Sequence, residues 1–122
     1  MGLTYEVDTS SGIVFVQWSG PVTIGDISEH WTLMLNDNEA LLCGKCFVDV
    51  RKSDPRFTGE ELRQLVRTVL EPALQGGRWK SAILVGKPVQ YGVARQYQVF
   101  TETFSEDAIF TDEAAAHDWI RG

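Results

Sequence analysis

The stretch KCFVDVRKSDPRFTGEELRQLVRTVL, residues 45–70, contains both kinds of element from which we expect the fold to be built. Residues 45–50 form an apolar run broken by one aspartate, a pattern typical of a central strand in a parallel sheet. Residues 58–70 place apolar side chains at helical spacing, and Thr58 with Glu61 predicts a capping box at the helix start. Residues 51–59 are expected to form a loop between them. The stretch therefore predicts one strand–loop–helix unit.

The helix of this unit should end soon after residue 70. Pro72 lacks a backbone N–H and should kink or end the helix, and Gly76 and Gly77 should stop any continuation.

Similar units are predicted on both sides of this stretch. Residues 3–7 and 13–18 predict two strands of an antiparallel hairpin, and Thr23 with Asp26 predicts a second capped helix over apolar residues between 24 and 34. Residues 81–85 and 107–110 predict two more buried strands. The helix expected from Pro88 carries its apolar side chains at Val93, Tyr97, Phe100 and Phe104. Thr111 or Asp112 should cap a last helix in which Ala115 and Trp119 share a face.

The predicted order of elements is ββαβαβαβα, and it indicates one α/β domain over residues 1–122. Short connections between repeated strand–helix units favour right-handed crossovers. We expect a mixed, mostly parallel sheet of five strands in which the first strand is antiparallel.

Composition excludes several classes of function. The chain has 11 Lys and Arg residues against 17 Asp and Glu residues, a net charge of −6, so broad binding to nucleic acid is not expected. Apolar runs fall short of the roughly 18 residues of a membrane span, and the N-terminus lacks a basic region followed by an apolar one. The expected location is cytoplasmic.

Cys43 and Cys46 are the two cysteines of the chain, and they suggest a redox or metal motif. They precede a strand, whereas a reactive C-x-x-C pair opens a helix whose dipole lowers the thiol pKa. Extended residues would hold their Cα atoms roughly 10 Å apart, too far for a disulfide, although Gly44 would allow a turn. His30 and His117 lack metal-ligand spacing. We interpret the cysteines as packing residues, with redox or metal use as the alternative.

The candidate binding site lies where the strands at 45–50 and 81–85 end. In open α/β sheets, ligands bind beyond the carboxyl ends of the strands. The two segments that follow these strands contain Arg51, Lys52, Arg56, Lys87 and Tyr91. Helix N-termini and cations together favour an anion, a carboxylate or an acidic partner surface. The alternative is that these cations pair with nearby carboxylates in solvent.

No catalytic constellation, metal site or cofactor motif is recognised in the sequence. Asp49 is expected to accept backbone N–H groups near the end of its strand, since a buried carboxylate needs partners. The sequence contains no G-x-S-x-G, H-E-x-x-H or P-loop pattern. We therefore predict no catalytic residue and lean against an enzyme.

Several segments resemble small bacterial SpoIIAA-like proteins of the STAS/SEC14-like group. The resemblance is carried by YEVDTSSGIVFVQWSGPVT, FVDVRKSDPRFTGEEL, YGVARQYQVFTE and AIFTDEAAAHDWI, which together span most of the chain. It implies a βα superhelix with a mixed sheet, helices largely on one side and no cofactor.

The resemblance also implies two sites. Anti-sigma-factor antagonists of this fold are phosphorylated at a serine in D-S-S-G, and the matching stretch here retains only Thr58 and Gly59, so Thr58 is the candidate phosphorylation site. The SEC14-like side implies a lipid-like ligand between helices and sheet. Its expected lining is Tyr91, Tyr97, Phe100 and Phe104. A plain core is the alternative for these aromatic residues.

The sequence thus favours a non-enzymatic module that binds a protein partner or a small ligand. A homodimer is expected, because a sheet covered on one face would leave apolar surface to bury. One alternative is a carrier or enzyme for a small anionic or lipid-like molecule at the strand ends. Another is a regulator switched by phosphorylation, resembling anti-sigma-factor antagonists.

Overall fold

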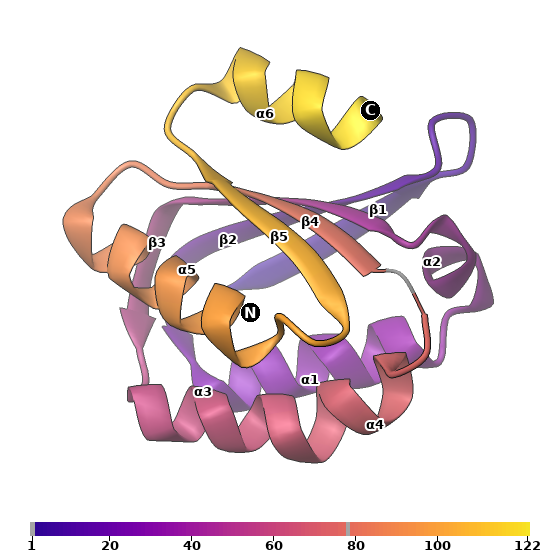
Figure 1. The fold of residues 1–122 in the computed structure, drawn as a ribbon. Coiled ribbons are helices and arrows are strands. Elements are labelled where there is room, and N and C mark those ends of the chain that lie inside the picture. Colours follow the sequence, from indigo (N-terminus) through magenta and orange to yellow (C-terminus); the bar gives the residue numbers. More distant parts are fainter. Residues whose placement is uncertain (1, 78) are drawn as a thin grey trace.

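A computed structural model describes residues 2–77 and 79–122 and contains one five-stranded sheet (Figure 1). The strands are β1 (Leu3–Asp8), β2 (Ile13–Thr23), β3 (Lys45–Arg56), β4 (Trp79–Leu84) and β5 (Ser105–Phe110). They lie in the order β1-β2-β3-β4-β5, with β1 antiparallel to β2 and the other neighbouring pairs parallel. The predicted α/β class with a mixed, mostly parallel sheet is confirmed.

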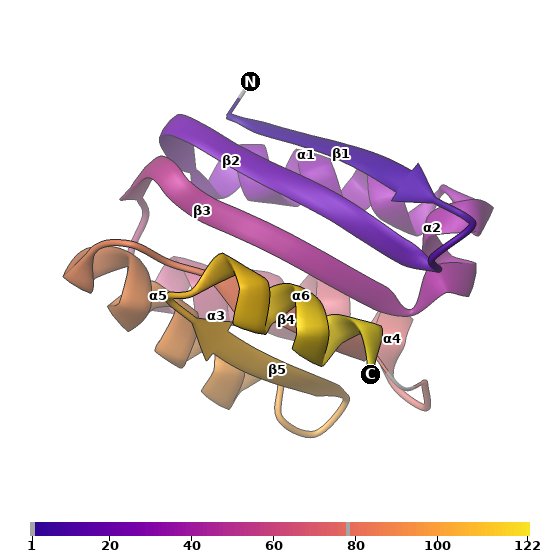
Figure 2. The same cartoon turned by 90° about the horizontal axis from the view of Figure 1, so that it is seen from above.

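Helices cover both faces of this sheet. They are α1 (Ile24–Leu35), α2 (Asn38–Cys43), α3 (Gly59–Leu65), α4 (Glu71–Leu74), α5 (Pro88–Phe100) and α6 (Glu113–Arg121). Figures 1 and 2 show α1, α3, α4 and α5 on one side, whereas α6 lies alone on the other and packs on β3, β4 and β5. The face that was expected to be open is therefore partly covered by α6.

The prediction of a loop at residues 51–59 is wrong, because β3 continues as a strand to Arg56. Its partner β2 is one residue shorter, with 11 residues against 12, and Ser19 to Thr23 pair in register with Lys52 to Arg56. Neither β1 nor β4 reaches this part, so it is a two-stranded ribbon. Pro21 and Pro55 are tolerated there because its outer edges carry no further strand. These prolines led the sequence-based prediction to end both strands early.

A bulge separates the ribbon from the main sheet. Gln17 pairs with Asp49 but Ser19 pairs with Lys52, so that Val50 and Arg51 together lie opposite one residue of β2. A bulge of this kind bends the strand and re-aims its side chains. It directs β3 towards the start of α3 (Figure 1).

The helix after β3 continues past Pro72 instead of ending there. A π-helical turn at Val66–Leu70 joins α3 to α4, and the Glu71 N–H donates to the Val66 carbonyl five residues earlier. The wider turn accommodates a proline, which cannot donate in a regular helical ladder. The helix ends at Leu74, before Gly76 with its φ of +89°.

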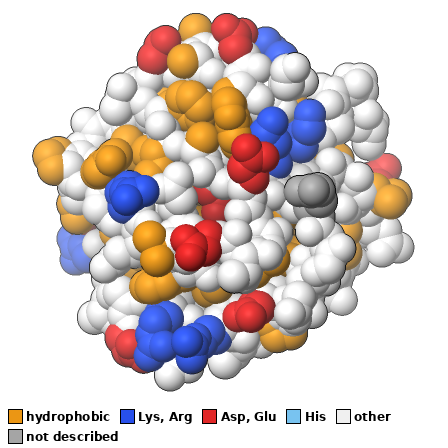
Figure 3. Space-filling view, in the orientation of Figure 1, with side chains coloured by type: hydrophobic (Ala, Val, Ile, Leu, Met, Phe, Trp, Pro, Cys, Tyr) orange, Lys and Arg blue, Asp and Glu red, His pale blue; other side chains and the backbone are white. Residues whose placement is uncertain are grey.

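Two other helix predictions need correction. The helix from Pro88 stops at Phe100, where Thr101 is the C-cap with a non-helical backbone (φ −105°, ψ 2°), and Phe104 enters the core from the following turn. In α6 the fully buried residues are Ala116 and Ile120, one position along from the expected pair. Figure 3 shows hydrophobic side chains gathered beneath this helix.

Cys43 and Cys46 lie on either side of a sharp turn and are both free. Cys43 ends α2, a short helix that the sequence did not predict, and Gly44 has a φ of +68° at its C-cap. Cys46 is buried in β3, and burial raises the pKa of its thiol far above the ordinary value. The thiol is therefore protonated at neutral pH, which agrees with a packing role.

Gly44→Ala should destabilise the protein by about 1 kcal/mol, because an L-residue is strained at this positive φ. Gly92→Ala is the matched control. Gly92 lies in α5 with open space around its Cα, so alanine should stabilise by about 0.5–1 kcal/mol there. Urea unfolding of both variants measures the difference. Equal effects of the two substitutions would contradict this account of the α2–β3 turn.

Candidate functional site

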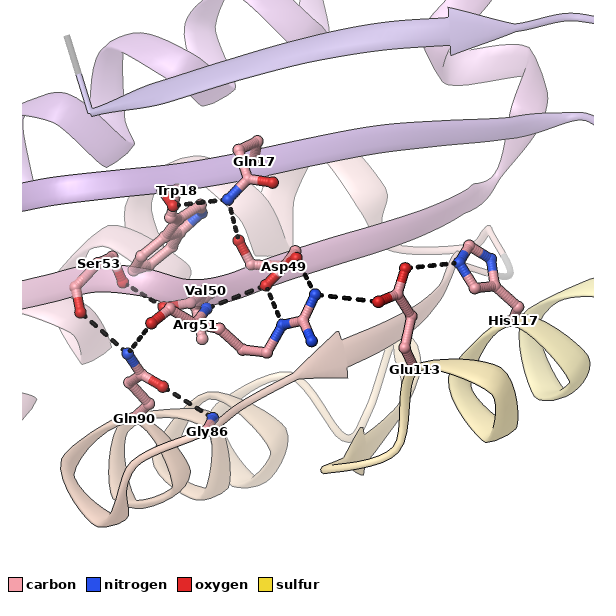
Figure 4. A network of polar contacts seen from close by, with 10 residues as sticks. All are labelled: Gln17, Trp18, Asp49, Val50, Arg51, Ser53, Gly86, Gln90, Glu113 and His117. Atoms are coloured by element: carbon pink, nitrogen blue, oxygen red, sulfur yellow. Dashed lines mark hydrogen bonds and ion pairs between the residues drawn. The ribbon is translucent and has the colours of Figure 1, made fainter.

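Asp49 and Arg51 form the centre of a polar network at the end of the main part of β3 (Figure 4). Asp49 Oδ1 accepts hydrogen bonds from the Arg51 backbone N–H (3.0 Å) and Nε (3.1 Å), and Oδ2 accepts from Nη2 (2.9 Å). Partial burial by itself would raise the pKa of Asp49, but the hydrogen bonds and charge of Arg51 outweigh burial and lower it. Asp49 is therefore a carboxylate whose charge Arg51 balances.

The network continues onto α6, which it fastens to the sheet. Arg51 Nη2 donates to Glu113 Oε1 at 3.1 Å, and Glu113 Oε2 lies 3.5 Å from His117 Nε2. The His117 ring stacks on Phe47 of β3, with centroids 4.2 Å apart and planes 13° apart. Arg51 thus holds two carboxylates, one from β3 and one from α6.

Gln90 fixes the start of α5 against the bulge of β3 (Figure 4). Its amide Nε2 donates to the carbonyls of Arg51 (3.1 Å) and Ser53 (2.9 Å), and its Oε1 accepts from the backbone N–H groups of Gly86 (2.9 Å) and Lys87 (3.1 Å). Gln90 is 1% exposed, and these four bonds satisfy its whole hydrogen-bonding capacity. The amide is a structural clamp between the two segments that sequence analysis singled out.

The structure brings part of the predicted cationic site together and separates the rest. The Arg51 side chain packs at the Gly86 segment, next to Lys87 at the N-cap of α5. Lys52 is exposed on the ribbon, and Arg56 lies at its far end with Asp54 at 2.7 Å. Arg51 and Arg56 are therefore paired with nearby carboxylates, which was the alternative to an anion-binding role. Tyr91 is half exposed on the first turns of α5.

Thr58 caps α3 as expected from its sequence. Its hydroxyl accepts from the Glu61 N–H at 3.1 Å, and the Glu61 carboxylate accepts from the Thr58 N–H at 2.8 Å. The hydroxyl is therefore engaged, and a phosphate on it would lie beside a carboxylate, which is an unfavourable juxtaposition.

A second candidate site is a cavity of about 70 Å³ between the sheet and the helices α1, α3 and α5. Its apolar wall is formed by Val16, Trp18, Ile27, Trp31, Val48, Val50, Pro55, Leu62, Leu65, Val66, Leu70, Ile83, Val93 and Ala94. Its polar lining residues are His30, Cys46, Ser81, Gln90 and Tyr97. Residues two apart on a strand share a face, which explains why Val16 with Trp18 and Val48 with Val50 both face this space.

Two of the polar lining groups lack hydrogen-bond partners. Within residues 2–77 and 79–122, no hydrogen bond is made by the His30 imidazole or by the Tyr97 hydroxyl. His30 is 8% exposed and has edge contacts with the rings of Tyr5 and Trp31. Burial lowers the pKa of His30 to about 4, so its ring is uncharged at neutral pH.

A buried carboxylate lies behind one end of this cavity. Asp107 of β5 is 8% exposed and accepts hydrogen bonds from the hydroxyls of Thr101, Ser105 and the lining residue Ser81. Burial raises the pKa of Asp107, and the hydroxyl bonds counter this only in part. Burial, followed by the negative charge of Asp107, also raises the pKa of Tyr97 well above its ordinary value. The Tyr97 hydroxyl therefore stays protonated at neutral pH and can donate a hydrogen bond.

The aromatic residues expected at an apolar pocket divide unequally. Tyr97 lines the cavity, whereas Tyr91 is half exposed, Phe100 packs against the core and Phe104 lies within it. Sequence analysis missed Trp18, Trp31 and His30 as lining residues. The alternation in β2 and the helical spacing in α1 identify their buried faces, but no sequence pattern indicates that the packing leaves a space.

Other kinds of site are not found in the part of the chain that the structure describes. No group of three or more His, Cys, Asp or Glu side chains there is arranged to hold a metal ion. No helix there is long and apolar enough to cross a membrane.

Comparison with solved structures identifies the fold. The chain is similar to the crystal structure of an uncharacterised protein of the DUF3478 family, with a SpoIIAA-like fold, from Shewanella loihica PV-4. The TM-score is 0.65 at 21% sequence identity, and the match covers 98% of this chain and 94% of the other. No family model matches the sequence, and the comparison with curated proteins gives no significant match. The chain therefore has a SpoIIAA-like fold, as its segments predicted.

Arg51→Met should destabilise the protein, because it leaves the Asp49 carboxylate without its partner and removes one of the ties to α6. The Arg51 side chain is 38% exposed, so solvent screening should hold the loss to about 1–2 kcal/mol. Arg56→Met, at an ion pair that is more than half exposed, is the control and should cost less than about 0.5 kcal/mol. Urea unfolding at pH 7 measures both, and equal losses would rule out a special role for Arg51.

The stability of the protein should fall as the pH drops from 7 to 5. Unfolded His30 binds a proton near its ordinary pKa of 6.5, whereas the folded residue stays uncharged down to about 4. Stability from this difference is present above pH 6.5 and is lost on acidification, by about 2 kcal/mol between pH 7 and pH 5. His30→Phe should remove this part of the pH dependence in urea titrations. An unchanged slope in the variant would show that His30 is not the titrating group.

Proposed function

We propose that this protein is a non-enzymatic binding module that holds a small, mostly apolar molecule in the cavity beneath its sheet. The proposal is carried by the cavity, which lies in the middle of the fold and is walled by β2, β3, β4 and three helices. Protein cores are close-packed, so an unfilled space among Trp, Leu and Val side chains is a departure that needs a reason. Concave, mostly apolar spaces with a few polar groups are the usual form of small-molecule sites.

The volume of the cavity limits the size of its ligand. An apolar cavity of roughly 150 Å³ holds benzene or xenon. A cavity of about 70 Å³ is therefore suited to xenon, and a small ring would enter it only if the wall expands. Trp18 and Trp31 on this wall provide broad contact surfaces for such a molecule.

A partner surface at the strand ends is the second candidate. Val89 and Tyr91 are 55% and 50% exposed beside Lys87, and exposed apolar side chains rimmed by charge are typical of protein contacts. Because Arg51 and Arg56 are already paired, Lys52 and Lys87 would supply the contacts to an acidic partner.

The other expectations from sequence stay predictions. The homodimer was predicted because one apolar face of the sheet was expected to be uncovered. In the structure α6 covers β3 to β5, and the register places Thr4 and Glu6 on the same face of β1 as Phe15 and Gln17 of β2, so the remaining surface is partly polar. Phosphorylation of Thr58, a carrier or enzyme activity and the cytoplasmic location are likewise predictions.

Xenon is the probe for occupancy of the cavity. Dissolved xenon should shift the NMR signals of methyl groups on the cavity wall, such as those of Val48 and Ile83, and leave the exposed Val99 unshifted. Val48→Ile should reduce the xenon-induced shifts by filling part of the space. It should also stabilise the protein by about 0.5–1 kcal/mol, as cavity-filling substitutions do.

Val99→Ile is the matched control, because it adds the same methyl group to an exposed position of α5. It should change neither the xenon shifts nor the midpoint of urea unfolding. The cavity would be rejected as a binding site by either of two results. One is that xenon shifts signals evenly over the surface; the other is that Val48→Ile and Val99→Ile have the same effect on the xenon shifts.

A further inference from the structure

The cavity is built for an uncharged occupant. None of its lining residues is Lys, Arg, Asp or Glu, and its one imidazole, that of His30, is uncharged at neutral pH. An anionic head group would find no cation there, and the Asp107 carboxylate behind the lining residue Ser81 would repel it. Moving an unpaired charge into such surroundings is strongly unfavourable. A carboxylate or phosphate group is therefore not expected inside the cavity.

Tyr97 supplies the polar contact that an uncharged ligand would use. Its side chain lines the cavity, and no hydrogen-bond acceptor pairs with its hydroxyl among the described residues. The neighbouring polar groups are already committed, because Ser81 bonds to Asp107 and Gln90 bonds to four backbone groups. Buried donors are rarely left without an acceptor. The free donor therefore indicates where the acceptor of a bound molecule belongs.

His30 provides a second indication of a polar contact from the opposite flank. It lines the cavity from α1, which lies under β1 and β2, whereas Tyr97 belongs to α5, which packs on β3 and β5 (Figure 2). Its imidazole is more than nine-tenths buried and also lacks a partner within residues 2–77 and 79–122. Two unpartnered polar groups in an otherwise apolar wall distinguish this space from a plain packing defect.

We propose that the cavity selects uncharged, mostly apolar molecules that carry a hydrogen-bond acceptor, such as small cyclic ketones, and that the Tyr97 hydroxyl donates to this acceptor. The inference rests on the proposed function, since it assigns a ligand class to the same cavity. The ring of such a ligand would contact the apolar wall, and its carbonyl would face α5. A carboxylate of the same size is rejected.

The test compares three probes in NMR titrations: cyclopentanone, the isosteric hydrocarbon methylenecyclopentane, and cyclopentanecarboxylate. In Tyr97→Phe the ketone should lose about 3- to 10-fold in affinity relative to the hydrocarbon, the contribution of one hydrogen bond. Tyr5→Phe is the matched control, because its hydroxyl binds Asp37 at 2.9 Å and Tyr5 is not among the cavity-lining residues. It should leave the ratio of the two affinities unchanged. The carboxylate should not bind the natural protein.

Each other outcome has a distinct meaning. If neither the ketone nor the hydrocarbon shifts the signals of the cavity wall, the proposed function itself fails. If both bind but their ratio is the same in Tyr97→Phe as in the natural protein, the cavity is a binding site and the role of Tyr97 is overturned. If the carboxylate binds as tightly as the ketone, the selection for uncharged molecules is overturned. Tyr97→Phe keeps the ring and removes a hydroxyl that has no partner, so it should fold normally.

Discussion

The buried amide of Gln90 is the interaction on which the rest of this arrangement depends. Beyond Asp49, β3 has no strand partner on its β4 side, and Gln90 satisfies the carbonyls of Arg51 and Ser53 there while its oxygen accepts the N–H groups that precede α5. Unsatisfied backbone groups at this depth would be strongly destabilising. The clamp therefore fixes where β3 bends, where α5 begins, and how far apart the helices lie beneath the sheet.

Charge and apolar space are divided between the two sides of this sheet. On the α6 side, the single guanidinium of Arg51 pairs with the carboxylates of both Asp49 and Glu113. On the other side, apolar side chains surround a space in which Tyr97 and His30 retain theirs. The charged residues on the α6 side are thus paired with one another. The unpartnered groups on the cavity side line a space that another molecule could occupy.

The sequence was sufficient for most of the fold because its local signals agree with one another. Both capping boxes, at Thr23 and Thr58, form as their spacing predicts, and apart from the short helix α2 the main strands and helices occur in the predicted order. The errors occur where tertiary contacts override local preference. The segment around Pro55 was predicted to be a loop, but β2 supplies a partner strand along it. A free edge, which tolerates proline, cannot be recognised from one strand alone.

The candidate sites were less predictable for a related reason. Sequence analysis located Arg51 but could not know that Glu113, 62 residues later, would share its guanidinium. It identified Tyr97 through an aromatic stripe, yet the same stripe included Phe104, which fills the core. A cavity depends on how closely the buried faces of helices and sheet pack against one another after folding. No single residue type signals it.

The ribbon formed by the ends of β2 and β3 has a consequence for how the chain behaves in a crowded cell. Gln90 and Gly2 each bond to one of its outer edges, but neither edge has a strand partner, and such edges can template a further strand, the route by which sheets join and aggregate. Pro21 and Pro55 each remove a donor from this ribbon, and Lys52, Asp54 and Arg56 add charge along it. The segment that carries the chain from the sheet into its helices is thereby protected against unwanted growth.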